Sequence, residues 1–162
     1  MTRTNEPTPK PLDMAAAMAR YHADRAAYER RAATVGPANK TALFDALAAA
    51  DITKVIVTFD GYGDSGQVED ISALSGGETV DLPTGEITIA RTAWGAEDIT
   101  EHDMMVEHAV EQLAYDFLAE THPGWENNDG AYGEFVFDVA ERTITLDHNE
   151  RYTATETYEH TF

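Results

Sequence analysis

Residues 100–150 constrain the fold more than any other stretch, because a helical apolar period is followed there by two strand-like segments. Thr100 and Asp103 resemble a capping box with Asp in place of the usual Glu. Pro123-Gly124 is typical of a helix end. Between these signals, apolar residues recur at steps of three and four, which places them on one face of a helix. They are Val106, Ala109, Val110, Leu113, Ala114, Phe117 and Leu118. We therefore predict one long amphipathic helix from about Thr100.

The residues after this helix predict a polar loop and a β-hairpin. Residues 125–130 are Trp, Glu, Asn, Asn, Asp and Gly, a composition typical of turns. Phe135 and Phe137, and then Ile144 and Leu146, alternate with polar or β-branched neighbours, as strands with one buried face do. Burying the apolar helix face on such a sheet contributes about 1.5–3 kcal/mol per large side chain.

Other segments of the chain add strands and define the fold class. A glycine-rich turn at residues 60–66 separates two of these segments. Strands are predicted at residues 54–59, 67–74, 86–93 and 152–162. The order of elements predicts an α+β fold: a mainly antiparallel sheet packed against one long amphipathic helix, with an N-terminal helical extension.

The N-terminal region differs from the rest in composition. Residues 1–11 contain three prolines and predict a mobile tail, and residues 12–33 favour a helix. Gly36-Pro37 is expected to break this helix before a second one at residues 38–50. We therefore predict two parts: residues 1–36 as a proline-rich tail and helix, and residues 37–162 as a single acidic α+β domain.

The first helix carries a thin heptad pattern that leaves two possibilities open. One is docking on the acidic body, with Met14, Met18, Tyr21 and Tyr28 turned toward apolar surface. The other is a dimer through the N-terminal helix, along the same positions. The pattern consists of Met14, Met18, Tyr21, Arg25, Tyr28, Ala32 and Val35.

Charge limits the kind of partner. The 162-residue chain has a formal net charge of −19. Residues 1–40 contain seven basic and four acidic residues, whereas residues 41–162 contain four basic and twenty-six acidic ones. A body this negative repels nucleic acids and anionic membranes and favours a basic protein surface, a cation or a high-salt solvent. We expect no direct nucleic-acid binding and no membrane association.

Composition also bears on location. The chain has no cysteine, no apolar run of 18 residues and no signal-peptide pattern. These features favour a cytoplasmic protein without disulfide or thiolate chemistry.

Two blocks together resemble a known family. They are TFDGYGDSGQVEDI at 58–71 and HPGWENNDGAYGEFVFDVAERTITLDHNER at 122–151. Their combination resembles an uncharacterised family, a domain of unknown function, of small acidic bacterial proteins often found on plasmids and phage-derived DNA. The resemblance covers roughly residues 50–162 and leaves the N-terminal helix outside. It implies a mobile-element setting, but no activity, cofactor or site residue.

Carboxylates and histidines offer a candidate cation site. The glycine-rich turn and the strand after it contain Asp60, Asp64, Glu69 and Asp70, although their spacing does not match an EF-hand loop. His108 and Glu111 lie three residues apart on the amphipathic helix, where they can share a cation. Glycine-rich turns with solvated carboxylates are the simpler interpretation.

The loop after the amphipathic helix is the main candidate for an interaction site. Loops held by rigid elements often carry function. The alternative is that the tryptophan covers the core edge while the Asn-Asp-Gly run forms a turn. The candidate residues are Trp125, Asn127, Asn128, Asp129 and Tyr132.

No motif is strong enough to name a reaction, so we expect a non-enzymatic protein without a cofactor. Its acidic body would bind a basic surface, as an inhibitor or nucleic-acid mimic acting on a host nucleic-acid-handling or defence protein. The alternative is a small metal-dependent hydrolase or cation-binding protein that uses the Asp60–Asp70 loop.

Overall fold

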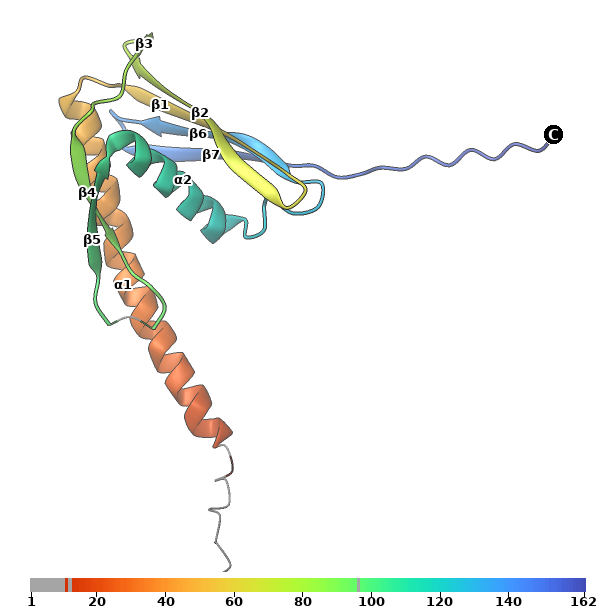
Figure 1. Cartoon of the computed structure of the whole chain (residues 1–162), viewed down its shortest axis with the longest axis horizontal. Coiled ribbons are helices and arrows are strands. Elements are labelled where there is room, and N and C mark those ends of the chain that lie inside the picture. The colour runs from red at the N-terminus through yellow and green to blue at the C-terminus, as the bar shows by residue number, and fades with distance from the viewer. Residues whose placement is uncertain (1–10, 12, 96) are drawn as a thin grey trace, which may run out of the picture.

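The computed structural model describes residues 11, 13–95 and 97–162. Within these residues, the chain forms two helices, a five-stranded antiparallel sheet of order β3-β2-β1-β6-β7, and a two-stranded antiparallel sheet of β4 and β5 (Figure 1). The predicted α+β class is confirmed. The elements are α1 (Met14–Ala49), β1 (Lys54–Tyr62), β2 (Ser65–Ser75), β3 (Glu78–Val80), β4 (Glu86–Arg91), β5 (Thr100–Met105), α2 (Val106–Thr121), β6 (Ala131–Asp138) and β7 (Thr143–Glu150).

One face of the large sheet carries the hydrophobic core. The helix α2 covers this face, and the second half of α1 packs at its end beside β4 (Figure 1). Phe44 of α1 meets Phe137 of β6 with ring centroids 6.3 Å apart. The predicted apolar stripe of α2 is buried against the core, apart from the half-buried Phe117. The fold therefore depends on helix-to-sheet packing on one side, and neither helix of the described residues covers the other face of the sheet.

The amphipathic helix begins six residues later than the sequence suggested. Residues 100–105 form β5, which pairs with β4 in the second sheet, so the predicted capping box at Thr100 and Asp103 is wrong. Asp103 instead lies opposite Thr88 and accepts a hydrogen bond from its hydroxyl at 2.6 Å. Pairing with β4 satisfies the backbone groups on one side of this segment, and a tertiary contact of this kind overrides a local capping signal.

Gly36-Pro37 does not break the first helix. The helix α1 runs unbroken from Met14 to Ala49 with Pro37 inside it. Proline in a helix interior costs about 3 kcal/mol, so contacts on both sides of it must offset that cost. Before the proline, Arg31 Nε donates to Thr92 Oγ1 at 3.2 Å. After it, Asn39 binds the backbone of β4. The boundary predicted between residues 36 and 37 thus falls inside one helix.

Asn39 is the polar residue through which α1 joins β4. Its side chain accepts a hydrogen bond from the Ala90 N–H and donates one to the Ala90 carbonyl, both at 2.8 Å. The residue is only 8% exposed. The amide therefore satisfies a strand edge that the helix would otherwise bury without partners.

The first turns of α1 extend away from the sheet (Figure 1). Met14, Met18 and Tyr21 are 62%, 49% and 48% exposed, so the expectation that these side chains dock on the body is wrong for the two methionines. Tyr21 and Tyr28, in contrast, do contact the body, because their rings lie against Trp94 in the β4–β5 connection, with centroids 5.7 and 5.5 Å away. A dimer through this helix stays a prediction.

Residues 152–162 do not add a strand to the sheet. They are extended and exposed, and they continue the line of β7 away from the body (Figure 1). The chain contains no glycine, proline or asparagine at residues 150–154 that would reverse it after β7. The predicted N-terminal tail, residues 1–11, lies outside the described residues except for Pro11.

Within the part of the chain that the structure describes, neither helix has the length and apolarity needed to cross a membrane.

We predict that Asn39→Ala destabilises the protein by about 2–4 kcal/mol, because it leaves the part-buried N–H and carbonyl of Ala90 without partners. Urea unfolding measures this loss, with the exposed Thr41→Ala on the same helix as a control. A change of less than about 0.5 kcal/mol, the usual range of surface substitutions, would show that the helix does not depend on this contact.

Candidate metal centre

Trp125 docks the loop after α2 onto the β1–β2 hairpin. Its indole lies over Gly61 and Gly66, which are cross-strand partners, and a Cβ added at Gly61 would come within 2.7 Å of the ring. The ring also meets Phe59 edge-on, with centroids 5.5 Å apart. The two glycines are therefore needed for the close approach of the indole, and not only for the turn between the strands.

A series of short turns carries the chain from α2 to β6. The N–H groups of Trp125, Asn127 and Gly130 donate to carbonyls three residues earlier, at distances of 2.9 to 3.1 Å. Gly124 and Asn128 adopt positive φ angles of 76° and 59°. This compact path holds His122, the C-cap of α2, close to the end of β7.

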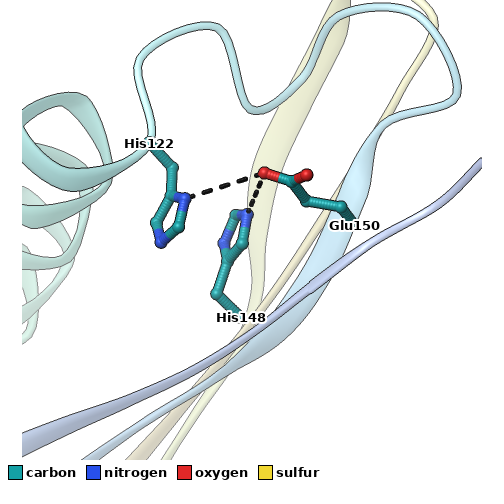
Figure 2. A group of neighbouring side chains, drawn as sticks. All are labelled: His122, His148 and Glu150. Atoms are coloured by element: carbon teal, nitrogen blue, oxygen red, sulfur yellow. Dashed lines mark ion pairs between the residues drawn. The ribbon is translucent and has the colours of Figure 1, made fainter.

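At that place His122, His148 and Glu150 come together (Figure 2). Glu150 Oε1 lies 3.8 Å from His122 Nδ1 and 3.7 Å from His148 Nε2. One potential ligand atom from each residue lies within 4.8 Å of the other two. His148 and Glu150 are two residues apart on β7, so the strand period points both side chains to the same face.

The two imidazoles stack face to face. Their centroids are 3.6 Å apart and their planes differ by 7°. His148 also stacks on Phe59, at 5.9 Å. The His148 side chain is only 6% exposed, and neither of its ring nitrogens has a hydrogen-bond partner. A buried imidazole without any partner is rare enough to need an explanation.

Electrostatics favour the neutral form of His148. Burial lowers its pKa below the ordinary value of 6.5, and the neighbouring His122 lowers it further, while Glu150 acts in the opposite direction. Neutral imidazole is the form that binds metal ions. The site thus keeps a metal-binding nitrogen free of protons near neutral pH.

The three residues fit a divalent transition metal. Two histidines and one carboxylate form a ligand set found in zinc sites, with a fourth position left for water or another ligand. Zinc–ligand bonds of about 2.0–2.2 Å require ligand atoms somewhat closer together than those seen here. Stacked rings hold their nitrogen lone pairs in parallel planes, so one imidazole must tilt for both to bind the same ion.

A polar cleft adjoins this cluster. It has a volume of ≈ 240 Å³, and its wall includes both His122 and Glu150. The remaining lining residues are Pro123, Gly124, Trp125, Asn127, Asn128, Asp129, Gly130 and Arg151. The predicted interaction loop and the histidine–carboxylate cluster therefore share one surface.

The structure separates the other carboxylates that the sequence suggested as ligands. Asp60 is held by Arg151 through two hydrogen bonds of 3.0 and 3.1 Å, so its oxygens are already engaged. Glu69 accepts a hydrogen bond from Gln67 and Asp70 one from Ser72.

The three remaining suggested ligands also lie elsewhere. Asp64 is exposed in the turn between β1 and β2, and His108 and Glu111 lie on α2. Among the described residues, none of the six suggested ligands joins a group of three with converging ligand atoms.

The five residues of the predicted interaction site differ in exposure and contacts. Trp125 is partly buried against the core, as the simpler interpretation proposed. Asp129 accepts a hydrogen bond from Thr153 at 2.8 Å. Tyr132 is 46% exposed, and the Arg151 guanidinium lies 4.6 Å from its ring centroid. Asn127 and Asn128 are exposed at the rim of the cleft.

Sequence reasoning missed all three members of the cluster. One signal was present: His148 follows Ile144 and Leu146 at steps of two, so the strand alternation places it on the core-facing side. His122 gave no such signal, because its approach to β7 depends on the docking of the tryptophan loop.

The fold and the site together define a small α+β protein with a histidine–carboxylate cluster at a sheet edge. The chain belongs to a family described as "Family of unknown function (DUF6878)", which matches residues 35–162. The match starts earlier than the resemblance suggested, because it includes the second half of α1. No curated protein and no solved structure matches the chain.

We predict that the metal-free protein loses stability as the pH falls below 6.5. The lowered pKa of His148 means that the unfolded chain takes up this proton more readily than the folded one. The loss begins near the unfolded value of 6.5 and is complete below the folded pKa. Melting temperatures in chelator between about pH 7.5 and 5 measure it.

The variants His148→Phe and His108→Gln serve as test and control for this pH dependence. Phenylalanine keeps an aromatic ring against Phe59 but cannot titrate. The melting temperature of this variant should therefore change less with pH than that of the wild-type protein. His108→Gln, which replaces an exposed side chain of α2, should give the same dependence of melting temperature on pH as the wild-type protein. An equal slope in the wild-type protein and in His148→Phe would contradict the assignment.

Proposed function

We propose that this protein binds a divalent transition metal ion, with zinc the best match, through His122, His148 and Glu150. The observation that carries the proposal is the buried His148, which has two unpartnered nitrogens and a carboxylate and a second imidazole within reach. This proposal departs from the expectation of no cofactor, and it replaces the Asp60–Asp70 loop as the cation site.

Three protein ligands leave one position open, as in catalytic rather than structural zinc sites. Held by His122, His148 and Glu150, a divalent metal ion would supply Lewis-acid chemistry for hydrolysis at this position. The cleft beside the cluster gives a small polar ligand access to that position. These features support the metal-dependent hydrolase that the sequence left as an alternative.

The test is a metal titration that follows the melting temperature and heat of binding. Zinc at one hundred times its dissociation constant should stabilise the protein by about 2.7 kcal/mol. Calcium and magnesium, which prefer oxygen ligands, should have little effect. Glu150→Gln should weaken zinc binding at least tenfold while keeping the packing, because Glu150 is exposed.

His108→Gln and Glu111→Gln are matched controls for this titration, since they remove the pair that the sequence suggested on α2. Both should bind zinc like the wild-type protein. The proposal fails if zinc gives no shift, or if Glu150→Gln and His148→Phe bind as tightly as the controls.

We also propose that the acidic body binds a basic protein surface. The helix-free face of the sheet supports this, because Asp70, Glu134 and Asp147 form one row across it. In the strand pairing, Thr58 lies between Asp70 and Glu134, and Glu134 lies opposite Asp147. All three carboxylates are exposed.

The partner we propose is a nucleic-acid-handling or defence protein of a bacterial host, which this chain would inhibit as a nucleic-acid mimic. The charge of residues 41–162 supports a salt-sensitive association with a surface that otherwise contacts phosphates. The bacterial cytoplasm and a mobile genetic element are the setting proposed with it.

A pull-down from bacterial lysate in low and high salt tests this second proposal. We expect basic proteins to be captured at low salt and released at high salt. Replacing Asp70, Glu134 and Asp147 with their amides should reduce capture more than amide replacements at Glu107, Glu111 and Glu120 on α2. Equal effects of the two triple variants, or capture that salt does not change, would count against the sheet face.

A further inference from the structure

Residues 152–162, the extended arm, have the sequence of a strand, but no strand among the described residues pairs with them. Tyr152, Tyr158 and Phe162 are 86%, 75% and 114% exposed. Within the described residues, the large sheet ends at β7, which pairs only with β6. The arm and the outer edge of β7 therefore both present backbone donors and acceptors to solvent, which is the condition for strand addition.

The arm keeps the side-chain alternation of β7. In β7 the even-numbered Ile144, Leu146 and His148 face the core side, and the odd-numbered Thr143 and Thr145 face the open side. In the arm, even positions carry all the large apolar residues, and four of the five odd positions are threonine. The even residues are Tyr152, Ala154, Glu156, Tyr158, His160 and Phe162.

The start of the arm is fixed in direction. The Arg151 N–H donates to the Gly130 carbonyl at 3.0 Å, and its guanidinium is held by Asp60 and by the Gly61 carbonyl. Thr153 then donates to Asp129. These contacts direct the chain straight out of β7 (Figure 1), away from the edge of its own sheet.

We propose that two copies of this chain exchange their arms, each arm adding an antiparallel strand to the β7 edge of the other copy. An arm of residues 152–162 is long enough to cover β7, Thr143–Glu150. A two-fold axis near Arg151 makes the interaction reciprocal, so one pairing used twice closes the dimer and covers both β7 edges. With this axis, each even-numbered residue of the arm lies opposite an even-numbered residue of the partner's β7, and both side chains lie on the core side of the sheet.

Other sheet edges fit the arm less well. The Val68 N–H on the β2 edge is already bound by the Tyr115 hydroxyl at 2.8 Å, and the strand has a bulge beside it. The edge of β4 is taken by Asn39. The edge strand β5 carries Glu101 and Asp103, charges of the kind that protect edges from pairing.

The oligomeric state of the full chain tests the proposal. Analytical ultracentrifugation should find a dimer that tightens as salt rises, because the two copies repel each other with a charge of −19 each. Deletion of residues 152–162 and Ala154→Pro, which removes a backbone donor that faces the partner's β7 edge, should give folded monomers. Ala154→Ser is the matched control and should stay dimeric.

Single cysteines locate the pairing, since the chain has no cysteine of its own. A Thr145→Cys chain mixed with a Thr157→Cys chain should form a disulfide between copies, because these positions lie opposite each other when the axis falls on Arg151. Thr155→Cys and Thr161→Cys test neighbouring registers, and Thr41→Cys on α1 should not react with Thr145→Cys.

Two results would overturn the exchange. A full chain that stays monomeric at high concentration and high salt would mean that the arm serves another protein or none. A dimer that survives deletion of the arm would assign self-association to another surface, such as the exposed methionines of α1.

Discussion

The contact between Trp125 and the glycine pair Gly61 and Gly66 holds the loop between α2 and β6 in place. The indole fills the space that two side chains would occupy and meets Phe59 at the edge of the core. It thereby ties the loop after α2 to the β1–β2 hairpin. His122 sits at the start of that loop, and His148 packs on the same Phe59. Phe59 is thus a common neighbour of the loop's tryptophan and of His148, which stacks on His122.

The surface around the histidine–carboxylate cluster belongs to a strongly acidic part of the chain. Only four basic residues accompany twenty-six acidic ones after residue 40, and two of the four, Arg142 and Arg151, pair with Asp45 and Asp60. Most carboxylates therefore face solvent without a nearby cation. A field of this sign concentrates small cations around the molecule and repels anions. A metal site and a surface for basic proteins are compatible on the same acidic body, since the field favours both.

The sequence predicted the elements with strong periods and missed those decided by contacts between distant segments. The apolar stripe of α2, the β6–β7 hairpin and the β1–β2 hairpin follow from local alternation, and the structure confirms them. The start of α2 was wrong because β5 pairs with β4, and the unbroken α1 depends on Asn39 at the same strand. The cluster of His122, His148 and Glu150 joins a helix end to a strand through a folded loop. No spacing in the sequence predicts that these three residues are in contact, although the alternation of residues around His148 indicates that its side chain is buried.

The length of α1 sets a physical scale for the whole molecule. A 36-residue helix is about 54 Å long, and about 38 Å of it separates Met14 from Asn39, where it joins β4. The matched family region begins at residue 35, so most of this rod lies outside it. A continuous helix fixes the distance between the body of the protein and any molecule that binds to the N-terminal end of α1. Any neighbour held by Met14 would be kept about 38 Å from the junction with β4, at a distance that the helix, rather than a flexible linker, determines.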